Sequence, residues 1–193
     1  MTNAAIFFET LVNLKHEVLG LELKPFCVLH LLWLQHIGSP LFVTSAPVKI
    51  EDVELAAIIC SCATNEEILA KLTPRNRWQR FLRNRWHRRN RRQDLATAVK
   101  SFLAYQDDFC SLPQFASKEQ NRDEKLPWLL LYAAGLIKAT GWDLVKVLTL
   151  PLGQVIWLNI SLGYLESGET SVISDRERAA MDALAALTGG GTA

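Results

Sequence analysis

The sequence predicts an all-α protein of seven to nine short helices in two lobes. Apolar residues recur at three- and four-residue intervals through most of the 193-residue chain, as one face of a helix requires. Glycine, proline and capping residues stand where one such segment gives way to the next. With 49% hydrophobic residues, the chain is long enough to bury a core without disulfides or metal ions.

A polar stretch without periodicity divides the chain. It contains one proline and several acidic residues, which is typical of a linker. We therefore expect an N-terminal helical lobe over residues 1–106, a linker over 107–126, a C-terminal helical lobe over 127–187 and a flexible tail over 188–193.

The first predicted helix covers residues 4–23. Its apolar stripe consists of Ile6, Phe7, Leu11, Leu14, Val18 and Leu21. Gly20 and Pro25 suggest where it ends. The second predicted helix, over residues 25–40, is apolar on nearly every side, which indicates burial on several sides or cover by a partner.

Two histidines lie in the second predicted helix. His30 and His36 are six residues apart, so they do not share a helix face well. We interpret them as hydrogen-bonded histidines within or at the edge of the core. Residues 41–49 are rich in β-branched and turn residues, and we expect a loop there with one short extended piece.

Two further helices are predicted before the arginine-rich segment. The one over residues 49–63 opens with Glu51 and Asp52, whose charges suit the positive end of a helix dipole. Thr64 or Asn65 then begins a shorter helix, which also has acidic residues in its first turn.

Nine of the twelve arginines fall within residues 75–92. The formal charge of the chain is +1, so the other residues carry 12 positive and 20 negative charges, a net of −8. If the run is helical, one side of it holds the apolar residues Trp78, Phe81, Leu82 and Trp86, and further on Ala96, Val99 and Leu103. The middle of the same side also receives Arg85, Arg89 and Arg92. Arginines therefore surround the helix, which argues against a membrane-surface helix with a clean apolar face.

The C-terminal lobe is predicted to contain short, strongly apolar helices over residues 127–141, 142–150 and 151–168. Gly141 ends the first of them. Ser174, with Glu177 at the capping-box spacing, is predicted to begin a last helix before the tail.

No catalytic, phosphate-binding or zinc-binding pattern occurs in the sequence. We expect no catalytic residues, no metal and no cofactor. An intracellular enzyme whose site draws on Asp107, Asp108 or His30 is the third alternative for the function. The N-terminus lacks the pattern of a signal peptide, and the chain has no run of ~18 uninterrupted apolar residues, so we expect no membrane contact.

The four cysteines are Cys27, Cys60, Cys62 and Cys110. The first three lie inside apolar segments, so we interpret them as buried, reduced thiols of an intracellular protein. A metal site that combines them with His30 is disfavoured, because two cysteines separated by one residue point apart on a helix.

Three interpretations of the arginine run stay open. Its guanidinium groups can meet an acidic protein surface, on this chain or on a partner. They can bind nucleic-acid phosphates while the aromatic residues stack on unpaired bases. They can also be a solvated helix face. The residues expected to bind a partner or nucleic acid are Arg77, Trp78, Arg80, Arg83, Arg85, Trp86, Arg88, Arg89, Arg91 and Arg92.

Two segments carry a resemblance to a known group of proteins. Residues 23–62 show an apolar helix with a histidine, a small turn ending in Ser-Pro, an acidic helix start and an apolar helix with cysteine. Residues 136–169 combine two short apolar helices around a proline. Both segments resemble parts of small helical tail assembly chaperones and related tail proteins of tailed phages and prophages. Together they cover about 40% of the chain, and the arginine run lies outside them.

The resemblance implies a helical, non-enzymatic tail assembly chaperone or tail-associated binding protein in the cytoplasm of a bacterial host. Such a protein would hold a helical client such as the tape-measure protein before assembly, in an apolar groove. Candidate groove residues, which also suit a plain core, are Leu31, Trp33, Leu34, Leu130, Tyr132, Trp157 and Tyr164. The alternative function is an RNA- or DNA-binding protein that acts through residues 75–92. The oligomeric state is open.

Overall fold

The computed structural model describes residues 15–42, 47–74, 76–109 and 128–168, with the single positions 172 and 179. Eight helices and one small two-stranded antiparallel sheet lie within these residues, which confirms the predicted all-α class and number of helices, although the hairpin was not predicted. The elements in chain order are β1 (His16–Val18), β2 (Leu21–Leu23), α2 (Val28–His36), α3 (Ile50–Cys60), α4 (Asn65–Leu72), α5 (Arg77–Asn90), α6 (Leu95–Phe109), α7 (Trp128–Thr140), α8 (Leu144–Thr149) and α9 (Leu152–Ser167).

The helix predicted for residues 4–23 is wrong over its second half, where β1 and β2 form a hairpin. Leu19 and Gly20 make the turn, and both have a positive φ, as a two-residue hairpin turn of the I′ type requires. Val18 and Leu23 are buried, whereas Glu17 and Glu22 face solvent. This alternation has the period of a strand, and it outweighs the helical spacing to the residues before it. Residues 1–14 lie outside the described part of the chain.

Helices α2 and α3 form the centre of the core, where α3 also packs on α6. The acidic start predicted for α3 is present: Asp52 accepts a hydrogen bond from the backbone N–H of Lys49 at 2.8 Å. The predicted cap of α4 is Thr64, whose hydroxyl accepts from the N–H of Glu67. Local capping therefore fixes where both helices begin.

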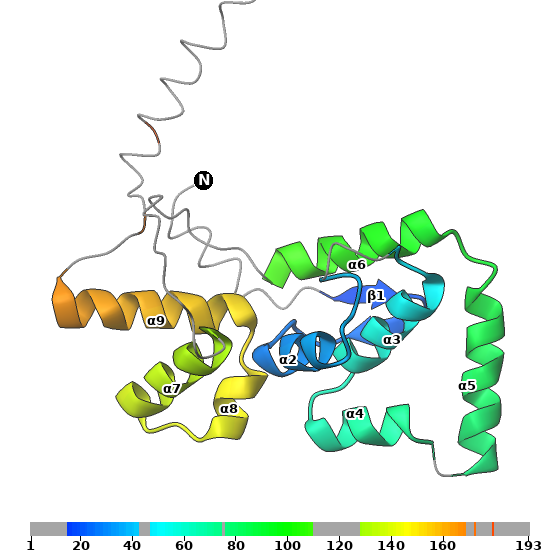
Figure 1. Cartoon of the computed structure of the whole chain (residues 1–193), viewed down its shortest axis with the longest axis horizontal. Coiled ribbons are helices and arrows are strands. Elements are labelled where there is room, and N and C mark those ends of the chain that lie inside the picture. The colour runs from blue at the N-terminus through cyan, green and yellow to red at the C-terminus, as the bar shows by residue number, and fades with distance from the viewer. Residues whose placement is uncertain are drawn as a thin grey trace, which may run out of the picture.

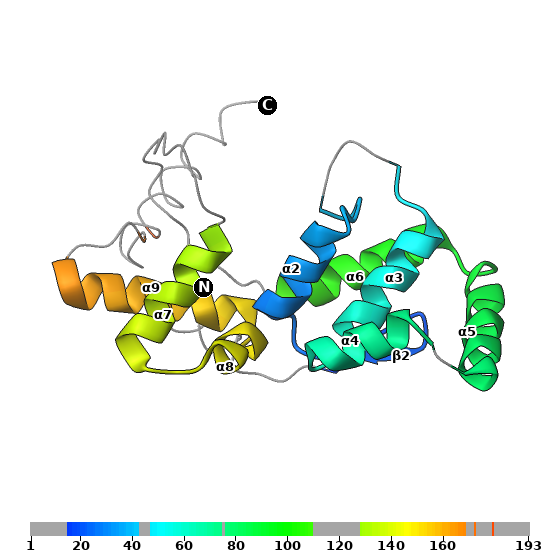
Figure 2. The ribbon, with the colours of Figure 1, turned by 60° about the horizontal axis from the view of Figure 1, so that its bottom comes forward.

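The arginine run and the segment after it form two separate helices. Asp94 lies between α5 and α6, and its carboxylate accepts hydrogen bonds from the N–H and the hydroxyl of Thr97. These hydrogen bonds from Thr97, together with one from the backbone of Ala96, hold the pKa of the Asp94 carboxyl below its ordinary value. The apolar stripe predicted to run from Trp86 to Leu103 is therefore interrupted. In both views α5 stands at one end of the molecule and runs from the end of α4 to the start of α6 (Figures 1 and 2).

Helices α7, α8 and α9 gather at the opposite end of the molecule (Figure 1). Gly141 ends α7 with φ +70°, as predicted, and Gly168 ends α9 with the same φ. Helices α7 and α9 pack closely at Gly135, where an added Cβ would lie 2.8 Å from Asn159 Oδ1.

The two groups of helices share one buried core, and the junction lies beside α2. The N–H of Leu152 donates to the carbonyl of Phe26 at 2.8 Å, and Cys27 and Pro151 form an isolated β-bridge. Helix α8 packs on α2. The linker predicted for residues 107–126 lies largely outside the described residues, and its first three positions form the last turn of α6. The cap predicted at Ser174 also lies outside them.

Three of the cysteines are buried free thiols, as predicted, and Cys110 lies outside the described residues. Burial raises the pKa of Cys27 to about 11, and burial likewise raises the pKa of Cys60 and of Cys62. None of the helices within the described residues combines the length and the apolar character that a membrane span requires.

His30 is a core histidine, as expected. Its Nδ1 accepts from the N–H of Cys27 at 3.4 Å, and its Nε2–H donates to the carbonyl of Cys62 at 2.8 Å. These two bonds need the neutral ring with its proton on Nε2. Burial lowers the pKa of His30 below its ordinary value of 6.5, although the bond to Cys62 acts in the opposite direction.

We expect His30 to make the protein less stable in acid. Because the pKa of His30 is lower in the folded state, the unfolded chain binds the proton first as the pH falls. The free energy of unfolding should therefore decrease below about pH 6.5, by at most ~1.4 kcal/mol per pH unit. Urea unfolding between about pH 7 and pH 5 measures this slope.

The variant His30→Gln should flatten this slope, whereas His36→Gln, at an exposed position, is the control. Equal slopes for wild type and His30→Gln would contradict the assignment.

Candidate functional site: the arginine-rich helix and its groove

Helix α5 attaches to the protein through one polar face. The side chains turned inward are those of Arg83, Trp86, His87 and Asn90, which are at least partly buried. Their spacing of three, four and seven residues puts them on one side of the helix. A helix with six arginines, followed directly by two more, is thus held mainly by polar contacts and one tryptophan.

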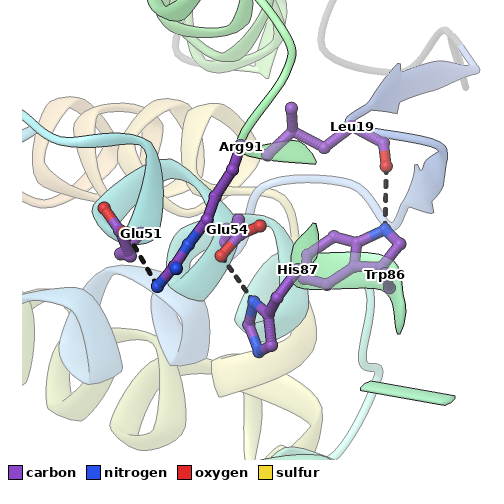
Figure 3. Close-up of polar contacts among 6 residues, drawn as sticks. All are labelled: Leu19, Glu51, Glu54, Trp86, His87 and Arg91. Carbon is purple, nitrogen blue, oxygen red and sulfur yellow. Dashed lines mark hydrogen bonds and ion pairs between the residues drawn. The ribbon is translucent and has the colours of Figure 1, made fainter. Parts of the chain in front are cut away.

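The hairpin turn is the first attachment point. Trp86 donates its Nε1–H to the carbonyl of Leu19 at 2.9 Å (Figure 3). Arg89 lies over the same turn, since a Cβ added to Gly20 would be 2.8 Å from its Nη2. The turn favours glycine at this position because of its positive φ, while the guanidinium is the end of a flexible side chain that can move aside.

The second attachment point is Glu54 on α3. Its side chain is 1% exposed, and its Oε2 accepts a hydrogen bond from His87 Nδ1–H at 2.5 Å (Figure 3). The other carboxylate oxygen, Oε1, is buried without a hydrogen-bond partner among the described residues. One turn closer to the start of α3, Glu51 pairs with Arg91 at 3.5 Å, and both of these side chains are exposed.

The first turns of α5 are tied to the last residue of α4 and to the segment that follows it. Arg83 Nη1 donates to the carbonyl of Leu72 at 3.0 Å, and Arg80 Nε donates to the carbonyl of Pro74 at 3.3 Å. Asn76 caps the helix by accepting from the N–H of Gln79 at 2.7 Å. Helix α5 is therefore held at its start, its middle and its end.

An apolar groove of about 530 Å³ lies between α4 and α5. It is lined by Leu21, Ile58, Ala70, Lys71, Pro74, Gln79, Leu82, Arg83 and Trp86. The charged groups in this lining are cationic. A second hollow of about 580 Å³ adjoins it over α4, with Ala70 and Gln79 in common and Leu69 and the acidic Glu66 on its wall. We call the first hollow the α4–α5 groove.

The opposite side of α5 faces away from the protein. Trp78 and Phe81 are 66% and 55% exposed, and their rings stack with centroids 5.7 Å apart and an interplanar angle of 24°. A hollow of about 310 Å³ beside them is lined by Phe81, Asn84, Arg85 and Arg88. We call Arg77, Trp78, Phe81, Asn84, Arg85 and Arg88 the outer face of α5.

The ten predicted binding residues thus fall into two groups. Those that point away from the protein or lie exposed past the helix end are Arg77, Trp78, Arg85, Arg88 and Arg92. Those that contact the rest of the chain are Arg80, Arg83, Trp86, Arg89 and Arg91.

The single apolar side predicted for the arginine run is wrong. Trp86 points inward to the hairpin, Leu82 lines the groove, and Trp78 and Phe81 lie on the outer face. Trp86 follows Trp78 by eight residues, which corresponds to two full turns of the helix plus ~80°. The two side chains therefore point in different directions.

Sequence reasoning missed the partners that hold α5. Glu54 was an available signal, because it is an acidic residue inside an otherwise apolar helix segment. His87 offered none, since it stands among arginines. Of the candidate groove residues suggested by the resemblance, Leu31, Leu34 and Trp157 are buried in the core. Trp33 and Tyr132 are partly buried, and only Leu130 and Tyr164 are exposed.

In the part of the chain that the structure describes, no group of three or more His, Cys, Asp or Glu residues is arranged to hold a metal ion. Comparison with protein family models, with curated proteins and with solved structures found no match.

The two acidic contacts of α5 should differ strongly in their effect on stability. His87→Ala leaves the buried Glu54 carboxylate without its partner, and we expect a loss of about 3 kcal/mol in the free energy of unfolding. Arg91→Ala removes an exposed pair and should cost less than about 1 kcal/mol. Urea unfolding followed by circular dichroism measures both values, and similar losses for the two variants would show that Glu54 does not depend on His87.

Proposed function

We propose that the protein is a non-catalytic binding protein that holds an amphipathic helix of another protein in the α4–α5 groove. The observation that carries the proposal is an apolar groove whose charged lining is entirely cationic. Helix-in-groove binding uses this combination of an apolar floor and a charged rim.

The groove leaves large apolar side chains in contact with water. Leu82 is 46% exposed on its wall, and Leu69 is 45% exposed in the adjoining hollow. Contiguous apolar surface of this kind is typical of partner sites. Fully burying a leucine side chain contributes about 1.5–3 kcal/mol, and each of these leucines is about half exposed. A helix that covers both therefore gains about 1.5–3 kcal/mol of the ~8 kcal/mol in a micromolar affinity.

The cationic residues of the groove indicate which kind of partner helix would bind there. Lys71 and Arg83 line the groove, and Arg80 lies beside it at the turn after α4. These cations attract the carboxylates of a partner, so we favour an acidic amphipathic helix.

The client that we favour is a tape-measure protein or another tail component of a phage. The support is the resemblance of residues 23–62 and 136–169 to tail assembly chaperones, and the groove gives such a chaperone a place to hold a client helix. The protein would then act in the cytoplasm of the bacterial host and carry out no chemical reaction.

A designed peptide tests the groove. The peptide has about 18 residues, with leucine at helical positions i, i+3, i+4 and i+7 and glutamate on the opposite side. We expect it to bind the full chain with micromolar affinity by fluorescence anisotropy. Leu82→Asp should weaken binding by about tenfold to 150-fold, since it places a charge in the apolar contact.

Leu103→Asp is the matched control, because Leu103 is 42% exposed on α6 and does not line the groove. A scrambled peptide of the same composition and a peptide with lysine in place of glutamate should not bind. Equal effects of the two substitutions would place the site elsewhere. For the phage client, a tape-measure fragment encoded by a neighbouring gene should stay in solution when coexpressed with wild type and aggregate with the Leu82→Asp variant.

A further inference from the structure

We propose that the outer face of α5 is a second binding site, separate from the groove, and that its ligand is single-stranded nucleic acid. It combines a row of arginines with an exposed, stacked aromatic pair. The proposed holding of a client helix makes no use of these residues.

The charge of the outer face is not neutralised within the described residues. The ion pairs found for α5 there use His87 and Arg91. Arg77, Arg85 and Arg88 are exposed and form neither an ion pair nor a hydrogen bond with another described residue. From Arg77 to Arg88 the helix rises about 17 Å, which is enough to follow several phosphates of one strand.

The aromatic pair favours nucleic acid over an acidic protein. An acidic protein surface would be bound by the cations alone. The two large rings, which are more than half exposed, would gain little binding free energy from contact with carboxylates. Unpaired bases stack on such rings, while arginines bind the neighbouring phosphates. The hollow beside Phe81, lined by Asn84, Arg85 and Arg88, offers amide and guanidinium groups next to a ring.

The same arrangement disfavours two other ligands. Bases in a duplex have their faces covered, so the Trp78–Phe81 pair can stack only on a single strand or a loop. A membrane surface needs a continuous apolar stripe, and on the outer face Arg77, Arg85 and Arg88 lie around the two rings.

The test measures binding of the full chain to labelled oligonucleotides of about 15 nucleotides. Oligothymidylate, oligouridylate and a duplex of the same length are compared by fluorescence anisotropy over a range of salt concentrations. We expect both single strands to bind more tightly than the duplex. A preference for oligouridylate would identify RNA as the ligand, and a preference for oligothymidylate would identify DNA.

Two sets of variants separate the contacts to bases from the contacts to phosphates. Trp78→Ala with Phe81→Ala should weaken single-strand binding by about fivefold to 150-fold per stacked base and leave the salt dependence unchanged. Arg77→Gln, Arg85→Gln and Arg88→Gln together should reduce the slope of log K against log salt by about 2. The control with equal loss of charge replaces three exposed lysines outside α5, Lys100, Lys138 and Lys146, by Gln and should leave binding unchanged.

Circular dichroism and binding of the amphipathic peptide establish that each variant is folded and keeps the groove. Three outcomes would overturn the proposal: no single-strand binding at low salt, equal affinity for the duplex without any effect of the aromatic substitutions, or displacement of the oligonucleotide by poly-L-glutamate at an equal concentration of charge. The last outcome would assign the outer face to an acidic protein.

Discussion

The buried carboxylate of Glu54 determines how the arginine-rich helix is presented. A carboxylate at 1% exposure in the middle of α3 needs a partner, because an unpaired buried charge is costly. His87 is that partner, and its bond to Glu54 fixes which side of α5 faces the protein. Because successive residues on a helix are ~100° apart, fixing the direction of one side chain fixes the others. Trp78 and Phe81 are consequently held outward and Leu82 toward α4, and both proposed sites depend on this one rotation.

A second constraint comes from the hairpin of β1 and β2. It places the carbonyl of Leu19 within reach of Trp86 and the bare backbone of Gly20 under Arg89. Leu19 is the one described non-glycine residue with a positive φ, which is a costly conformation for a leucine. The turn is thus kept in an unfavourable local geometry where it meets α5, and the indole and the guanidinium that pack there help to stabilise it.

The contrast between what could and could not be predicted from the sequence follows from the range of the interactions. The starts of α3 and α4 and the end of α7 depend on residues within one turn, such as Asp52, Thr64 and Gly141, so local patterns located them well. The hairpin was missed because Val18 and Leu21 fit both a helical spacing and a strand. The orientation of α5 depends on Glu54, which is 33 residues away in sequence, and no period within residues 75–92 carries that information.

The distribution of charge also explains why α5 remains available to partners. The chain outside residues 75–92 carries a net charge of −8, enough to neutralise most of the arginine run if the acids lay beside it. Within the described residues, however, only Glu51 and Glu54 pair with α5, and they contact its inward side and its end. The other arginines stay solvated and can still attract an anionic ligand. For charges in water, this attraction contributes more to partner binding and to the association rate than to the stability of the fold. The outward-facing arginines, unlike Arg80 and Arg83, therefore add little to the stability of the fold. Their concentration on a helix held by a few inward residues is best explained by what that helix binds.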